Sequence, residues 1–234
     1  MCTSASAGVS FQSGVNQTTL IELYSSEGCS SCPAAESWLS ALKGQEGLWK
    51  DFVPVALHVD YWDALGWKDK FASPKFTQRQ RKYADTWRAN TVYTPGFIVN
   101  GEEWRGWYEQ RSLVTNNKDR VGVLTIEANG DNQFQITFEP QESIEGAMKV
   151  HIALLGFDLE TQVRSGENSG KLLKHDFVAL NYDETKLKQK DNQWVADFQL
   201  SPKKGFTSSQ LAVVAWVTSE DGLTPIQATG GYLS

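Results

Sequence analysis

The chain has 234 residues, and its 22 basic against 28 acidic side chains give a net charge of −6. The basic residues form no long run that would neutralise a phosphate backbone, so we expect no nucleic-acid partner. No stretch approaches the roughly 18 consecutive apolar residues of a membrane-spanning helix. Hydrophobic residues make up 40% of the chain, which is enough to close a core, and the length favours two domains.

The first 16 residues are small, polar and rich in glycine and serine, which predicts a flexible tail over residues 1–16. They show neither the basic start nor the apolar stretch of a signal peptide. Cys2 directly follows Met1, as in a recombinant chain that begins at the lipid-carrying cysteine of a mature bacterial lipoprotein. A lipid anchor at Cys2 would then be the contact with a membrane, and the alternative is an ordinary thiol in a flexible tail.

A cysteine pair lies at the first junction of predicted elements. Residues 18–26 carry an apolar run that predicts a buried strand, and residues 34–43 repeat apolar side chains at helical spacing. Between them stands Cys29-Ser30-Ser31-Cys32-Pro33. Pro33 suits the first turn of a helix, because its missing N–H would have no partner there. The pair is therefore expected at a helix N-terminus.

The following region continues the same alternation of strand and helix. Residues 52–61 alternate in side-chain character, as a central strand does, and Ser73-Pro74 opens a predicted helix. Thr94-Pro95 then precedes two extended runs that are joined by Asn100-Gly101, the strongest short-range signal of a hairpin. This order predicts an α/β domain over residues 17–118.

The second half of the chain has a different character. Short runs of alternating side chains are separated by turn residues, with no comparable helical pattern. These runs cover residues 123–128, 134–138, 148–155, 177–182, 194–200 and 211–217. They predict a mainly antiparallel β-sandwich domain over residues 119–234, packed on the first domain.

The cysteine pair carries the clearest chemistry. A thiolate, not a thiol, attacks a disulfide, and a helix N-terminus lowers the pKa of a cysteine from about 8.5 to roughly 3.5–7.5. Cys29 is placed for that role and is the expected nucleophile. Cys32, one turn further on, would resolve the mixed disulfide and release the substrate. Ser30 and Ser31 are small hydrogen-bond donors that would support the Cys29 sulfur.

The same cysteine spacing also forms half of many zinc sites. A zinc site needs two more ligands, whereas this chain has no second C-x-x-C pair and only three histidines, His58, His151 and His175. We therefore expect no metal and no cofactor.

Residues 18–108 resemble the thioredoxin superfamily, through the cysteine pair and the Thr94-Pro95 step before a hairpin. The resemblance implies that Pro95 is a cis-proline packed against the disulfide and that Thr94 offers its backbone to a bound peptide. The alternative is an ordinary trans bond, since only about 5–6% of X-Pro bonds are cis. Thioredoxin also has a buried acid where this chain has Leu23, so its proton path is not expected here.

Several motifs resemble an uncharacterised family of secreted bacterial proteins, catalogued as domain of unknown function 1223. They are Glu27-Gly28-Cys29-Ser30-Ser31-Cys32-Pro33, His58-Val59-Asp60-Tyr61-Trp62-Asp63, Gly66-Trp67-Lys68-Asp69, Arg79-Gln80, Tyr93-Thr94-Pro95 and Gly166-Glu167-Asn168-Ser169-Gly170. With the run from residue 211 to 230, the resemblance covers nearly the whole chain. It implies a thioredoxin-like fold and a periplasmic or secreted location, without naming a substrate.

Two polar side chains and two further segments have open roles. His58 and Asp60 share a strand face and would either tune Cys29 and shuttle protons or form an ordinary polar pair. The glycine-rich residues 166–170 would serve as a plain linker, or Glu167 and Asn168 would cap the domain boundary or close over the active site. Five tryptophans would either line a peptide groove or belong to the core: Trp62, Trp67, Trp87, Trp104 and Trp107.

The leading hypothesis is an exported thiol-disulfide oxidoreductase that uses Cys29 and Cys32, with Thr94 and Pro95 shaping the substrate site. Its partners would be protein thiols or disulfides and a redox partner protein. A copper-binding metallochaperone, with Cys29, Cys32 and His58 as ligands, is the first alternative. The second is a non-catalytic binding protein with a structural Cys29–Cys32 disulfide.

Overall fold

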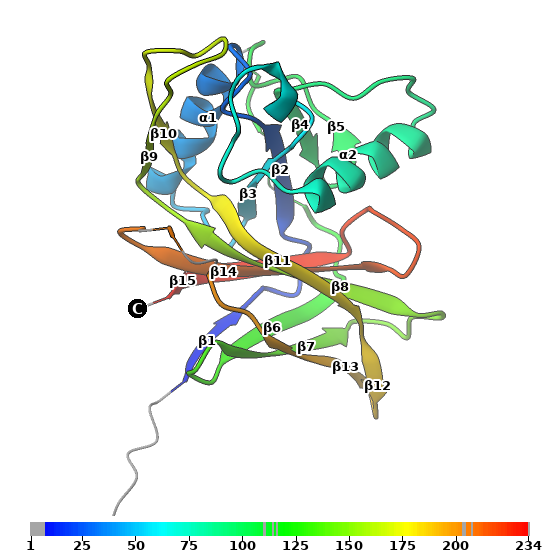
Figure 1. The fold of residues 1–234 in the computed structure, drawn as a ribbon. Helices are drawn as coiled ribbons and strands as arrows, with labels where there is room; N and C mark the ends of the chain where they lie inside the picture. Colours follow the sequence, from blue (N-terminus) through cyan, green and yellow to red (C-terminus); the bar gives the residue numbers. More distant parts are fainter. Residues whose placement is uncertain are drawn as a thin grey trace, which may run out of the picture.

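The computed structural model describes residues 8–233, except 110, 114, 116, 203, 204 and 207. Within these residues the chain forms fifteen strands, two α-helices and two short 3-10 helices. Strands therefore dominate, and most of them belong to two large sheets (Figure 1). None of the described helices is long and apolar enough to cross a membrane.

The larger sheet has eight strands in the order β15-β14-β8-β11-β3-β2-β4-β5. Its members come from both halves of the sequence: β2 (Thr19–Ser25), β3 (Phe52–His58), β4 (Gly96–Val99), β5 (Glu102–Glu103), β8 (Met148–Gly156), β11 (Val178–Lys186), β14 (Leu211–Ser219) and β15 (Gln227–Leu233). The two halves meet where β3 pairs in parallel with β11, with Val178 opposite Ala56.

The predicted fold class, an α/β thioredoxin-like domain plus a β-sandwich domain, is wrong. The chain is mainly β-sheet with only two α-helices in the described residues, and the strands of the expected α/β layer continue into a sheet built from the second half. The physical reason is edge pairing. β3 would expose unpaired backbone groups on one side, and β11 supplies their partners.

A smaller sheet packs on one side of this large sheet. Its five strands run in the order β1-β6-β7-β13-β12. They are β1 (Val9–Gln12), β6 (Gly122–Ala128), β7 (Gln133–Pro140), β13 (Gln193–Gln199) and β12 (Lys188–Lys190). β1 lies within the segment expected to be a flexible tail, and it pairs with β6. Cys2 and the lipid anchor expected there lie outside the described residues.

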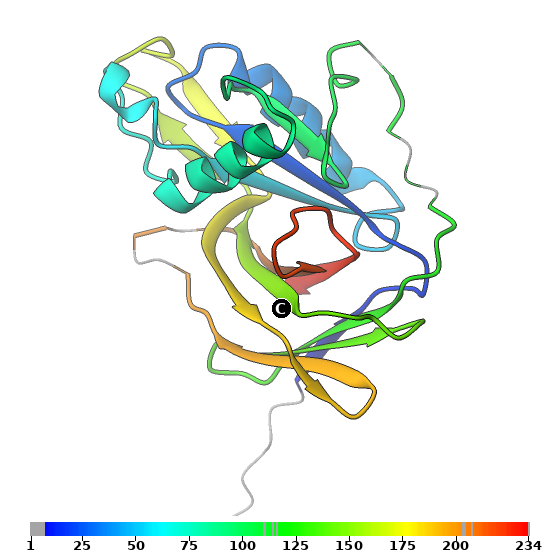
Figure 2. The ribbon, with the colours of Figure 1, turned by 90° about the vertical axis from the view of Figure 1, so that its right-hand side faces the viewer.

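The two helices lie on the other side of the strands β8, β11 and β14, as both views show (Figures 1 and 2). They are α1 (Cys32–Ser40) and α2 (Pro74–Thr86), each with a proline in its first turn. The 3-10 helices follow α1 (Ala41–Gly44) and precede α2 (Asp63–Leu65). β2 and β3 are buried along their whole length, because side chains cover both of their faces.

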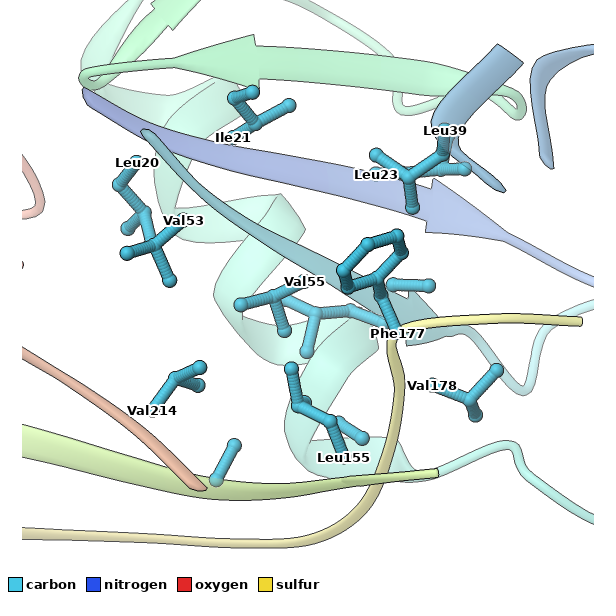
Figure 3. Packing of buried hydrophobic residues seen from close by; sticks show 14 of the residues in the cluster. Leu20, Ile21, Leu23, Leu39, Val53, Val55, Leu155, Phe177, Val178 and Val214 are labelled. Carbon is cyan, nitrogen blue, oxygen red and sulfur yellow. The ribbon is translucent and has the colours of Figure 1, made fainter. Parts of the chain in front are cut away.

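Side-chain alternation along β8 divides the hydrophobic interior into two cores. Val150, Ile152 and Leu154 point into the core against the smaller sheet. Ala153 and Leu155 point into the core under the helices. Figure 3 shows this second core, where Leu155 lies near Val55 and Val214. The buried strand β2 thus ends just before the loop that carries the cysteines.

A third, two-stranded sheet stands apart from the other two. β9 (Leu159–Gln162) and β10 (Leu172–His175) form a hairpin whose tip spans residues 163–171. The hairpin lies beside α1 (Figure 1). It therefore brings residues from the second half of the chain to the cysteine pair.

Candidate functional site

The cysteine pair lies at the N-terminus of α1, as the sequence predicts. Cys29 follows β2, and Cys32 is the first residue of the helix after the N-cap Ser31. Both thiols are free in this structure, and both are buried, with 1% of Cys29 and 0% of Cys32 exposed. The Cys29 Sγ lies 3.3 Å from the Ser31 Oγ, so Ser31 does contact the sulfur it was expected to support.

The two thiols have opposite acidities. A hydrogen bond with Cys32 lowers the pKa of Cys29 to about 6, against the effect of burial, and hydrogen bonds from Ser31 and Thr94 assist. Burial raises the pKa of Cys32 well above its usual value, and the neighbouring Cys29 adds to that shift. At neutral pH the pair can therefore hold one thiolate, on Cys29, and one thiol, on Cys32.

The Thr94-Pro95 step lies next to the thiols. Its peptide bond is cis, and the Thr94 hydroxyl accepts a hydrogen bond from the Trp62 Nε1 at 2.8 Å. Trp62 also packs against Gly28 of the cysteine loop. The approach is so close that a Cβ atom added to Gly28 would lie 3.1 Å from the Trp62 Cβ. Trp62 thus holds together two segments that sequence reasoning placed in one site.

An open cleft of about 340 Å³ begins at Thr94 and Pro95. Aromatic side chains dominate its wall, and Arg105 adds one charge. The other residues that line it are Tyr93, Phe97, Trp104, Trp107 and Tyr108. Tyr108 is 55% exposed, which is unusual for a large aromatic side chain. Trp104 and Trp107 therefore border a groove. Trp62 donates a hydrogen bond to Thr94, Trp67 donates one to Glu27 just before the cysteines, and Trp87 stacks on Tyr83 of α2.

The tip of the β9–β10 hairpin covers the cysteine loop. The buried Asn168 donates from its Nδ2 to the carbonyl oxygens of Glu27 and Cys29, both at 2.9 Å. The Glu167 carboxylate accepts a hydrogen bond from the Ser30 N–H at 3.0 Å, and hydrogen bonding to the side chain and the backbone of Ser30 lowers the pKa of Glu167. Residues 166–170 are therefore more than a linker, because they cover the cysteine loop.

His58 and Asp60 do not form a pair with each other. The His58 Nδ1 lies 2.6 Å from the Asp69 Oδ2, and Asp60 accepts a hydrogen bond of 2.5 Å from the Thr77 hydroxyl. Asp60 therefore anchors α2. His58 instead belongs to a buried polar cluster behind the cysteines.

The buried polar cluster consists of Glu27, Glu36, His58, Asp69 and His175. Glu36 lies one helical turn after Cys32 and contacts both Ser25 and the His175 Nδ1 through hydrogen bonds. The His175 Nε2 is 3.3 Å from the Glu27 Oε1, and the His58 Nε2 is 3.9 Å from the Glu36 Oε1. The cluster thus joins α1, β3 and β10.

Charge attraction dominates the acidities in this cluster. Burial alone would lower the pKa of His175, but Glu36 and Glu27 outweigh that effect and raise it to about 10. Asp69 raises the pKa of His58 in the same way against burial. Burial would raise the pKa of Glu36, but the attraction of His175 lowers it. Without a bound cation, the cluster is therefore a network of ion pairs.

Sequence reasoning missed most of this cluster. Among the described residues, Glu36, His58 and His175 are the group whose ligand atoms lie close enough to hold a metal ion, and neither cysteine belongs to it. Of the three ligands named for the alternative copper site, Cys29, Cys32 and His58, this group contains His58 alone. Glu36 could have been predicted from its position in the sequence. It follows Cys32 by four residues, and residues four apart lie on the same face of a helix and share its environment.

Fold and site together define a mainly β-sheet protein with a buried dithiol at a helix N-terminus and an aromatic cleft beside it. The model of a family described as "Protein of unknown function (DUF1223)" matches residues 20–218, and the chain belongs to this family. No curated protein matches the chain.

Two solved structures are similar over most of the chain. Protein AGR_C_4864 from Agrobacterium tumefaciens is 26% identical, with a TM-score of 0.60, and the match covers 93% of this chain and 94% of that one. HBP35 of Porphyromonas gingivalis is 14% identical, also with a TM-score of 0.60, and the match covers 94% of this chain and 76% of that one. At 14% identity, the similarity to HBP35 shows a shared fold and nothing more.

Proposed function

We propose that this protein is a thiol-disulfide oxidoreductase. The Cys29 thiolate attacks a substrate disulfide, forms a mixed disulfide and releases one substrate thiolate. Cys32 then loses its proton and displaces the second substrate sulfur, which leaves a Cys29–Cys32 disulfide and a fully reduced substrate. A redox partner protein returns the two electrons, and the same steps in reverse oxidise a dithiol. Cys29 is the nucleophile and Cys32 the resolving thiol.

The observation that carries the proposal is the opposite acidity of two thiols three residues apart, at the N-terminus of α1. A pKa of about 6 makes Cys29 largely thiolate at neutral pH. The raised pKa of Cys32 keeps a proton on the second sulfur until the mixed disulfide has formed. These are the protonation states that the first step of disulfide exchange requires.

The substrate class follows from the cleft beside Thr94 and Pro95. Its aromatic wall suits apolar side chains of an extended peptide, and Arg105 is the one charged side chain among its lining residues. We therefore propose protein thiols and disulfides as substrates. The resemblance to the thioredoxin superfamily supports Thr94 and Pro95 as the substrate-binding segment, and a periplasmic or secreted location belongs to the same proposal.

One observation favours a second candidate. Cys29 is only 1% exposed, so a substrate disulfide reaches its sulfur only if covering side chains move aside. A structural Cys29–Cys32 disulfide in a non-catalytic binding protein needs no such access. The copper-binding alternative has less support, because both ring nitrogens of His58 face carboxylates rather than sulfurs.

The reduction potential of the Cys29/Cys32 couple separates the two candidates. A chain with Cys2→Ser is equilibrated with glutathione or dithiothreitol buffers, and its alkylated thiols are counted. A value between about −270 and −120 mV, the span of known catalytic pairs, is expected for an oxidoreductase. A pair that stays oxidised below about −300 mV would identify a structural disulfide instead.

The pH dependence of alkylation tests the acidity of Cys29 directly. The rate with iodoacetamide follows the thiolate fraction, so it should rise with pH around a midpoint near 6. Cys32→Ala removes the largest cause of the lowered pKa and should move the midpoint upward. The unfolded chain in guanidinium serves as the control, with a midpoint near about 8.5. A folded midpoint at the unfolded value would contradict the proposed nucleophile.

A further inference from the structure

Three buried side chains from distant parts of the sequence meet behind the cysteine loop. Glu36 comes from α1, His58 from the end of β3 and His175 from the end of β10. Each offers one ligand atom, and these atoms all lie within 4.8 Å of one another. The side chains are 0 to 7% exposed, so water competes little for these atoms.

Each of the two imidazoles has a carboxylate on the nitrogen that faces away from Glu36. The His58 Nδ1 is 2.6 Å from the Asp69 Oδ2, and the His175 Nε2 is 3.3 Å from the Glu27 Oε1. Backbone N–H groups of Glu27 and Phe71 hold the Asp69 carboxylate in place. A carboxylate on the outer nitrogen is the usual support of a metal-binding histidine, because it fixes the ring and the tautomer.

A second observation points to a missing ligand. Few buried polar side-chain atoms in the described part of the chain lack a hydrogen-bond partner. Three of them belong to this cluster, but the His175 Nε2 and the Glu27 Oε1 face each other at 3.3 Å. The His58 Nε2, which lies 3.9 Å from the Glu36 Oε1, is the proposed ligand atom without a hydrogen-bond partner. A buried polar atom without a partner keeps the full cost of its lost hydration, so a ligand bound there is favoured. A cation bound between the rings and Glu36 would relieve the His58 Nε2 directly.

We infer that Glu36, His58 and His175 form a binding site for one divalent transition-metal ion of the zinc type. The ligands are a Glu36 carboxylate oxygen, the His58 Nε2 and the His175 Nδ1. Asp69 and Glu27 orient the two rings. Three protein ligands leave the fourth position of a tetrahedral ion free for water or another ligand.

The donor set selects the class of metal. Imidazole nitrogens suit zinc, copper, nickel and iron, whereas magnesium and calcium prefer ligand sets made of oxygen alone. In a tetrahedral site with bonds of about 2.0–2.2 Å, neighbouring ligand atoms lie roughly 3.3–3.6 Å apart. In this structure the three ligand atoms lie within 4.8 Å of one another, so small side-chain movements would bring them to the distances of a tetrahedral site. Glu36 would exchange its hydrogen bond with His175 for the bond to the metal.

The test uses the full chain without thiols, carrying Cys2→Ser, Cys29→Ser and Cys32→Ser, so that sulfur cannot bind the ion. Titration with zinc ions in a calorimeter should show one equivalent bound per chain. X-ray absorption of the bound zinc should show two imidazole nitrogens and no sulfur. Because the cysteines are absent, this result is independent of the proposed redox activity.

Matched histidine variants locate the ion. His58→Gln and His175→Gln should each weaken zinc binding by at least about 100-fold, and Asp69→Asn by about 10–100-fold. His151→Gln is the control, because His151 is equally buried but bonds to Tyr182 and Thr218 elsewhere. Failure of the thiol-free chain to bind zinc, or a spectrum without two imidazoles, would overturn the proposal even if a histidine variant did not fold.

Discussion

Replacing Cys29 with serine is expected to reduce disulfide-exchange turnover by about a thousandfold or more, because a serine hydroxyl is not ionised near neutral pH and cannot attack a disulfide. Cys32→Ser should behave differently. It keeps the Cys29 nucleophile and the first exchange step, but it cannot resolve the mixed disulfide. Reduction of a model peptide disulfide by dithiothreitol measures turnover, and intact-mass spectrometry detects the trapped adduct.

The comparison between the two variants is more informative than either loss alone. An adduct on Cys32→Ser and none on Cys29→Ser would assign the nucleophile and the resolving thiol. Cys2→Ser should leave turnover unchanged and serves as the control. Equal losses without an adduct in either variant would mean that the pair is structural, in agreement with its near-complete burial.

Individual strands and helices could be predicted from the sequence, whereas the pairing of the strands could not. The runs that became β2, β3 and α2 were identified from side-chain periodicity, since periodicity reports which faces are buried. Periodicity does not say which strand lies alongside. The apolar run of β3 suits either an α/β layer or a larger sheet. Its pairing with β11 joins residues 56 and 178, which are far apart in the sequence. The predicted fold class failed at that pairing.

The same distinction between local and long-range information applies to the candidate site. Cys29 and Cys32 were predicted because their motif lies at a junction between local elements, and Thr94 was predicted through the resemblance to the thioredoxin superfamily. His175 and Glu36 are 139 residues apart, and no local pattern connects them. Asn168 lies in a glycine-rich segment whose composition fits a linker as well as a cover. Long-range polar contacts of this kind require the fold before they can be assigned.

A second buried network, built on Glu22, explains how an acid is tolerated inside β2. Glu22 is 1% exposed, and its Oε1 lies 2.6 Å from the Nε of Arg79 on α2. The Tyr83 hydroxyl donates a hydrogen bond of 2.6 Å to the other carboxylate oxygen, and the Tyr24 hydroxyl contacts Oε1 at 3.2 Å. The guanidinium also lies 5.2 Å from the Trp216 ring. The network fixes α2 on the sheet.

Arg79→Met is expected to lower the free energy of unfolding by about 3–5 kcal/mol, because it leaves the Glu22 carboxylate buried without its ionic partner. Urea denaturation followed by tryptophan fluorescence measures the loss. Adding Glu22→Gln to Arg79→Met should restore most of the stability, since the double variant removes the uncompensated charge. Lys174→Ala, at an exposed ion pair with Glu160, is the control and should leave the unfolding midpoint nearly unchanged. If Arg79→Met were as mild as Lys174→Ala, the buried pair would contribute nothing to the attachment of α2, and packing against Trp216 and Tyr83 would have to account for it.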